Sequence, residues 1–205
     1  MAIVDRFVLD VPESWADLDL SGSVLAETRA AALALTESPR EKATINDMFR
    51  QAREVSRAAR RHGALFAAGT ATIFEDGLFL GYAMVFAVTA PPGRELTLPV
   101  LAAQLSPGGT GGSKAGADRT VSAVTLPNIG QVARITGTEE AQIAADITVR
   151  MLTMHTVIPI PGSMGDYLIV TCASPNLPLA ADVYELFDAI SGTFRFLPAE
   201  QPAGA

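Results

Sequence analysis

The clearest pattern along the chain is the apolar stripe of a long helix that begins after Ser38. Ser38, Pro39 and Glu41 supply an N-cap serine, a proline at the first helical position and the glutamate of a capping box. Apolar side chains then recur at spacings of three and four residues, at Ile45, Met48, Phe49, Ala52, Val55 and Ala59. Two arginines, a histidine and Gly63 end the pattern, since cations and a left-handed glycine are typical of a helix C-terminus. A shorter helix is predicted over 24–36.

Most other apolar runs have the length and bounding turns of strands. The predicted strands cover 3–9, 15–20, 64–74, 78–89, 119–126, 130–136, 143–160 and 167–173. An Asp-Gly turn between the third and fourth is a strong hairpin signal, because type I′ turns need positive φ at both central positions. Strands that follow one another in hairpins favour an antiparallel sheet.

The remaining segments complete the predicted organisation. A short helix over 96–105, a flexible glycine-rich loop over 107–117 and a closing helix over 179–194 are expected, the last after the start signal Ser174-Pro175-Asn176. The predicted class is α+β, with an antiparallel sheet flanked by helices. We expect one domain over residues 1–197 and a flexible tail over 198–205.

Composition and charge exclude several classes of function. The chain has 205 residues, 49% of them hydrophobic and 18% charged, and its net charge is -7. That charge repels phosphates and anionic headgroups, so sequence-independent nucleic-acid binding is not expected. The longest apolar stretch, 77–92, is shorter than the roughly 20 residues that span a bilayer, so no membrane insertion is expected.

The residue usage also indicates a compartment and a source. Cys172 is the single cysteine, which rules out an intrachain disulfide and a multi-thiolate metal site. The N-terminus has acids where a signal peptide needs a basic segment, so a cytoplasmic location is expected. Two lysines against thirteen arginines, with many Ala and Gly, are typical of a high-GC bacterium.

No group of residues predicts catalysis, a cofactor or a metal. In the glycine-rich loop Lys114 follows Ser113 and precedes Ala115, unlike a phosphate-binding loop. The other candidates have plain structural interpretations: a helix-capping His62, a structural or surface His155, a turn residue Ser163, a buried Cys172 and a solvated pair Glu139-Glu140. None of the histidines or the cysteine has an evident partner in the sequence.

A stripe of arginines on the long helix is the one candidate for binding. Arg50, Arg53, Arg57 and Arg61 fall on one side at helical spacing, and Lys114 adds a cation in the glycine-rich loop. A solvated helix face is the plainer interpretation, and docking of an acidic partner is the functional one. A mean hydropathy of +0.28 further favours self-association or an exposed partner-binding patch.

Three segments resemble PsbP-like domains and a group of actinobacterial proteins with the same ending. They are FVLDVPESW over 7–15, VIPIPGSMGDYLIVTCASPN over 157–176 and VYELFDAISGTFRF over 183–196. The resemblance implies an α/β/α sandwich around an antiparallel sheet and a non-catalytic binding or assembly role. It supplies no catalytic residue, and the long helical segment 24–62 departs from it.

The sequence therefore favours a non-catalytic protein-interaction or assembly module of a high-GC bacterium, with a protein partner or a second copy. The alternative is a small-molecule-binding protein, or a hydrolase with a site that the sequence does not reveal. A deep pocket with convergent polar groups would favour this alternative, and a flat apolar patch would favour the module.

Overall fold

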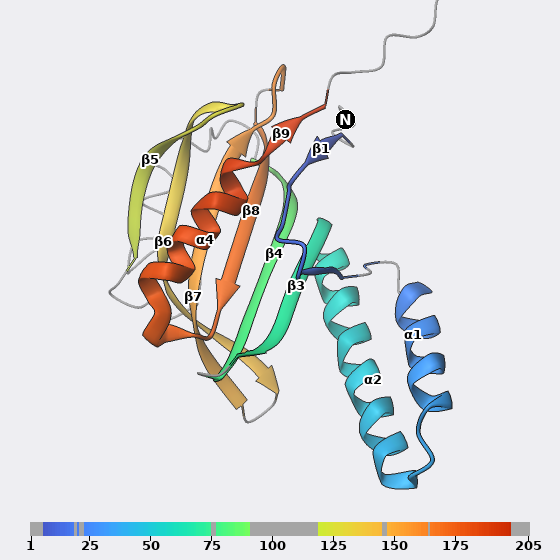
Figure 1. Ribbon diagram of the computed structural model, residues 1–205. Coiled ribbons are helices and arrows are strands. Elements are labelled where there is room, and N and C mark those ends of the chain that lie inside the picture. The colour runs from blue at the N-terminus through green and yellow to red at the C-terminus, as the bar shows by residue number, and fades with distance from the viewer. Residues whose placement is uncertain are drawn as a thin grey trace, which may run out of the picture.

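A twisted antiparallel sheet forms the centre of the computed structural model (Figure 1). The structure describes residues 6–18, 20, 23–74, 77–90, 119–144, 147–163 and 165–197. Within these residues the sheet has the order β2-β3-β4-β8-β7-β6-β5. Its strands are β2 Ala16–Asp17, β3 Ala64–Phe74, β4 Gly77–Thr89, β5 Thr120–Leu126, β6 Gly130–Ala144, β7 Ile147–Pro159 and β8 Asp166–Ser174. Each neighbouring pair is antiparallel.

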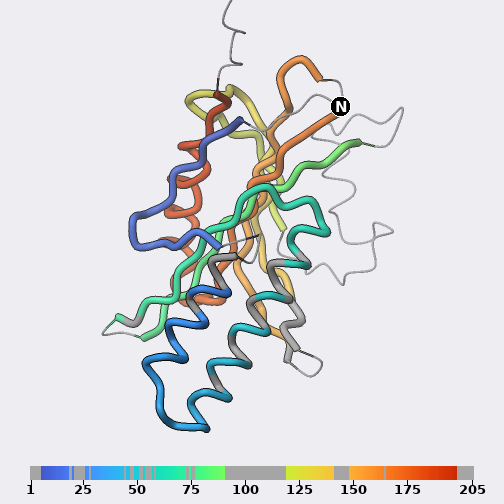
Figure 2. Tube along the Cα trace, turned by 90° about the vertical axis from the view of Figure 1, so that its right-hand side faces the viewer, coloured from blue at the N-terminus to red at the C-terminus, as the bar shows by residue number. Residues whose placement is uncertain are grey.

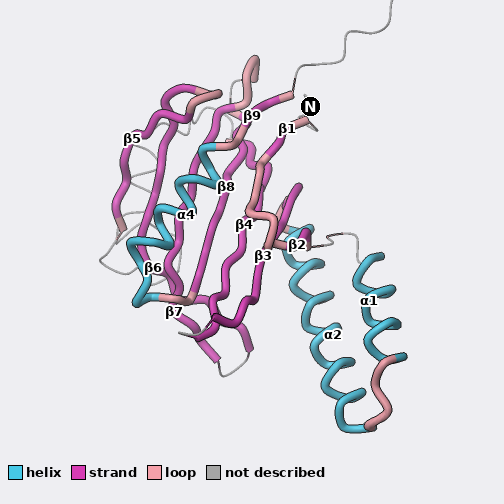
Figure 3. Tube along the Cα trace, viewed as in Figure 1, coloured by secondary structure: helices cyan, strands magenta, loops and turns pink. Residues whose placement is uncertain are grey.

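One helix covers one face of this sheet. A short 3-10 turn, Leu177–Leu179, leads into α4, Ala180–Gly192, which lies across β7 and β8 (Figures 1 and 3). Val183, Phe187 and Ile190 of α4 are at most 3% exposed and pack on the alternate residues of the strands beneath. This interface is the main hydrophobic core.

The two ends of the described chain meet beside this helix. β1, Phe7–Val8, pairs with β9, Arg195–Phe196, and the rings of Phe7 and Phe194 stack with centroids 5.5 Å apart. The opposite face of the main sheet carries a second apolar cluster around Ala133, Ile135 and Val157.

The first two helices form a hairpin beside the β3 edge of the sheet. They are α1, Ser23–Ala34, and α2, Pro39–Arg61, and both views place them beyond the strands rather than over the face that α4 covers (Figures 1 and 2). The predicted end signal of α2 is present, since Gly63 has a φ of 80°. Ser38 Oγ accepts from the Glu41 N–H at 3.5 Å, as the capping pattern predicts.

The predicted α+β class, with an antiparallel sheet and flanking helices, is confirmed. The boundary between β6 and β7 was predicted wrongly, because the strand expected over 130–136 continues to Ala144 through the acids Glu139 and Glu140. Acidic residues have a low β-propensity, but cross-strand partners override it here. The N-terminal strands are also shorter than predicted in their described parts.

The residue predicted to start α4, Asn176, forms different hydrogen bonds from those of a helix cap. Asn176 makes no capping hydrogen bond to the helix that follows. Its side chain instead bonds the edge of β4, accepting from the Leu80 N–H at 3.0 Å and donating to the Leu78 carbonyl at 2.8 Å. The expected helix over 96–105, the loop over 107–117 and the tail over 198–205 lie outside the described residues.

Candidate functional site

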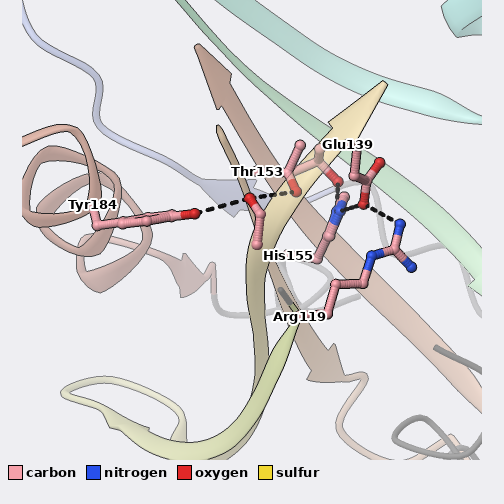
Figure 4. A network of polar contacts seen from close by, with 7 residues as sticks. Arg119, Glu139, Thr153, His155 and Tyr184 are labelled. Carbon is pink, nitrogen blue, oxygen red and sulfur yellow. Dashed lines mark hydrogen bonds and ion pairs between the residues drawn. The ribbon is translucent and has the colours of Figure 1, made fainter. Parts of the chain in front are cut away.

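A polar network lies on the sheet face opposite α4, where three neighbouring strands each contribute a side chain. Glu139 comes from β6, His155 from β7, and Arg119 lies just before β5 (Figure 4). Thr171 comes from β8. His155 and Thr171 face each other in the β7–β8 register. Successive side chains of a strand alternate between faces, so these positions all point to the same side.

His155 connects the members of this network. Its Nδ1 lies 3.0 Å from the Thr171 hydroxyl, and its Nε2 lies 3.0 Å from Glu139 Oε1. Arg119 donates to the same carboxylate oxygen at 2.8 Å. The side chains of Arg119, His155 and Glu139 are 13%, 20% and 30% exposed. The Glu139 carboxylate thus accepts hydrogen bonds from two donors, and all three side chains are partly shielded from solvent.

These contacts change the acidity of the groups around the carboxylate. The hydrogen bond from His155, followed by the charges of His155 and Arg119, lowers the pKa of Glu139 against the opposing effect of burial. Burial raises the pKa of Tyr82, and the Glu139 charge adds to that rise. Arg119 Nε is buried without an acceptor, so the network leaves one donor unsatisfied.

The network reaches α4 through one backbone carbonyl. Gly137 O accepts from Thr153 Oγ1 at 3.3 Å and from the hydroxyl of Tyr184, on α4, at 2.8 Å (Figure 4). These bonds connect β6 to both β7 and the helix. They are suited to holding strands and helix in register.

The order hydroxyl, imidazole, carboxylate is also that of a hydrolytic relay. Such a relay requires free backbone N–H groups near the hydroxyl to stabilise an oxyanion. Thr171 lies in a central strand paired on both sides, to Met84 and His155, so the N–H groups of its strand are used by the ladder. In the part of the chain that the structure describes, no group of three or more His, Cys, Asp or Glu side chains is placed to hold a metal ion.

Two sequence-based interpretations change here. His155 has two partners, although the sequence suggested none, and Glu139 is paired rather than solvated. Glu140 is exposed, as expected of a solvated acid. His62, predicted to cap α2, lies exposed at the end of that helix. Cys172 is buried, as predicted, and burial raises the pKa of its thiol to about 12.

A buried arginine on β6, Arg134, connects α4 to the sheet. Arg134 of β6, 7% exposed, forms an ion pair with Asp188 and donates to Ser191 Oγ at 2.9 Å. Its Nε lies 3.4 Å from Thr156 Oγ1. Sequence analysis did not single out Arg134, because nothing local distinguishes it from the surface arginines.

The predicted arginine stripe lines a cleft between α1 and α2. The cleft encloses about 290 Å³ and is lined by Arg29, Asn46, Phe49, Arg50, Arg53 and Arg57. Arg29 comes from α1, and its Nε and Nη2 donate to Asn46 Oδ1 of α2 at 2.8 and 2.6 Å. This contact joins the two helices across the cleft.

The structure thus brings three of the five predicted partner-binding residues to one cavity. Arg53 is half-buried there, while Arg50 and Arg57 are exposed. Arg61 is exposed at the end of α2 and does not line the cleft, and Lys114 lies outside the described residues. Arg29 was missed, since only the packing of α1 on α2 brings it to the stripe.

Comparisons with known proteins assign the chain to no family. No protein-family model matches the chain, and no curated protein matches it. One solved structure that is similar is that of LpqN, involved in cell envelope biogenesis of Mycobacterium tuberculosis. The similarity covers 94% of this chain and 83% of that one, at 13% identity and a TM-score of 0.43. These values carry no argument about function, and the resemblance to PsbP-like domains is not confirmed.

The helices add one finding on membranes. In the described ranges, none of them combines the length and the apolar character that crossing a bilayer requires.

Proposed function

We propose that the protein is a non-catalytic interaction module that binds an acidic segment of a protein partner in the α1–α2 cleft. The observation that carries this proposal is the convergence of four arginines, Arg29, Arg50, Arg53 and Arg57, on one cavity. The chain as a whole is acidic, with a net charge of -7. A concentrated positive site on such a chain is a local exception, and it complements an acidic surface.

The chemistry of the lining supports a carboxylate-bearing occupant. Guanidinium groups present planar forks of donors that match carboxylates, so arginine is the residue suited to such contacts. No described acidic residue forms an ion pair with Arg29, Arg53 or Arg57. Their charges are therefore not neutralised by the described acids of the chain.

The size and lining of the cleft favour this function over an apolar small-molecule pocket. Ligand pockets typically enclose about 300–1,000 Å³ and are lined mostly by hydrophobic side chains. The volume of this cleft lies just below that range, and Phe49 is the one aromatic residue among the described ones that line it. An open, charged groove suits a segment of a protein better.

A binding assay with two matched peptides tests the proposal. One is a fluorescein-labelled peptide of alternating Glu and Ala, and the other has Gln in place of each Glu. We expect the Glu peptide to bind, and Arg53→Gln/Arg57→Gln to weaken binding about tenfold by fluorescence anisotropy. Arg61→Gln removes a charge from the same helix outside the cleft, so it should leave binding nearly unchanged.

The assay can also contradict the proposal. If the Gln peptide bound as tightly as the Glu peptide, charge would not be the basis of recognition. Equal affinities of the wild type and Arg53→Gln/Arg57→Gln would place the binding surface elsewhere. Circular dichroism confirms that each variant keeps its helices before its affinity is compared.

A further inference from the structure

The outward face of α4 carries a row of acidic side chains. Asp182, Glu185 and Asp188 recur every third residue and are exposed, because the opposite side of the helix is buried against the sheet. Ala181 and Ala189 are exposed beside them. Small side chains next to the acids let another element approach the helix closely.

This row matches the spacing of the arginines in the cleft. Arg50, Arg53 and Arg57 lie three and four residues apart on α2. A helix rises 1.5 Å per residue, so the cations are about 4.5 and 6 Å apart along the axis and the acids about 4.5 Å. Two helices laid side by side can therefore bring Arg53 and Arg57 near a pair of carboxylates, those of Asp182 and Glu185. Asp188 keeps its ion pair with Arg134. Phe49 in the cleft would face the exposed alanines.

One copy of the chain does not bring its own α4 to its own cleft. α4 lies across β7 and β8, whereas the α1–α2 hairpin lies beyond the β3 edge (Figure 1). The exposed acids Asp182 and Glu185 and the cleft arginines Arg53 and Arg57 thus belong to one molecule without meeting within it. An isologous pair can use both at once, each copy giving one helix and one cleft.

From this complementarity we infer that the acidic segment bound in the α1–α2 cleft is α4 of a second copy of the chain. The inference rests on the proposed function and names the occupant of the same site. Contacts between exposed charges are individually weak and are screened by salt. The association is therefore a weak one, favoured by high protein concentration and low ionic strength.

Charge reversal on either side tests the inference. Sedimentation equilibrium of the wild type at low salt should show a mass that rises above 21.5 kDa with concentration. The cleft variant Arg53→Glu/Arg57→Glu and the helix variant Asp182→Lys/Glu185→Lys should each self-associate at least about tenfold more weakly. Asp188 is left unchanged because it pairs with Arg134. Glu13→Lys, an exposed acid remote in sequence from α4, is the control.

The decisive measurement is a mixture of the two variants. In a mixed dimer, the glutamates in the cleft of one variant face the lysines on α4 of the other. The second interface joins the unchanged cleft of the helix variant to the unchanged α4 of the cleft variant. We therefore expect an equimolar mixture to regain the association that each variant alone has lost. A site for an unrelated acidic protein gives no such recovery.

Two outcomes would overturn the inference. A wild type that stays at the monomer mass while binding the Glu peptide would leave the proposed function intact and exclude a second copy as the occupant. A mixture of folded variants that fails to associate, where the wild type does associate, would place the self-contact on other surfaces. If neither peptide nor second copy binds the cleft, the proposed function fails as well.

Discussion

The helices α4 and α2 are both amphipathic in sequence, yet they are buried to very different extents. α4 buries Val183, Phe187 and Ile190 completely or nearly so on the sheet. Among the described side chains of α1 and α2, Ala59 is the one that is buried, and Leu35 in the connection is 89% exposed. The comparison teaches that helical patterning does not by itself identify a core helix.

The arginines of the two regions show the same contrast. Arg134 is buried under α4 and donates to three neighbouring side chains, so it fixes the position of the helix. Arg29, Arg53 and Arg57 line an open cleft and pair with none of the described acids. The first kind of arginine holds the helix on the sheet, and the second kind is the one that we propose for recognition.

The largest expected effect concerns an aromatic ring in each region. Phe187→Ala removes a ring that is 0% exposed and leaves a cavity in the core, so it should cost about 3–5 kcal/mol of unfolding free energy. Phe49→Ala removes a half-buried ring from the hairpin and should cost about 1 kcal/mol or less. Urea denaturation measures both. Equal costs would show that the hairpin is packed as tightly as α4.

A smaller effect is expected from the arginines. Arg134→Met leaves Asp188 and Thr156 without their guanidinium partner and should cost about 2 kcal/mol. The loss of unfolding free energy is smaller than for a fully buried ion pair. The Asp188 side chain is 63% exposed, so water can solvate it once Arg134 is removed. Arg53→Met in the cleft should change stability by less than about 0.5 kcal/mol. Thermal unfolding measures the stability of both variants. A larger loss for Arg53→Met than for Arg134→Met would refute this prediction.

The smallest effect concerns Glu139 and depends on pH. Glu139→Gln should destabilise the protein by about 1 kcal/mol near neutral pH, because the donors His155 and Arg119 lose a charged acceptor. The pKa of Glu139 is lowered from its ordinary 4.5, so its contribution is complete above that value. It is lost as the pH falls through the lower value of the folded protein. Denaturation midpoints of wild type and variant should therefore converge in acid.

The neighbouring acid provides the control for that measurement. Glu140 is exposed on the same strand, and Glu140→Gln should change stability little at any pH. A constant difference between the wild type and Glu139→Gln across the acid range would show that the Glu139 charge does not stabilise the fold.

Features encoded by neighbouring residues were predictable from the sequence. The start and end of α2 and the β3–β4 hairpin follow from the sequence pattern, and the structure confirms them. Caps, turn residues and apolar spacing act over a few positions, so a single segment carries them. The arginine stripe on α2 belongs to this group, since helical geometry alone places it on one side.

Only the tertiary structure decided where these elements meet. The extension of β6 through Glu139 depends on Arg119 and His155, which lie 20 and 16 residues away. The cleft needs Arg29 from another helix, and the role of Arg134 needs α4, more than 50 residues later. The sequence by itself determined the local elements and their class. The pairing of charges between distant strands and helices was decided by packing, because burial alone distinguishes one arginine or glutamate from another.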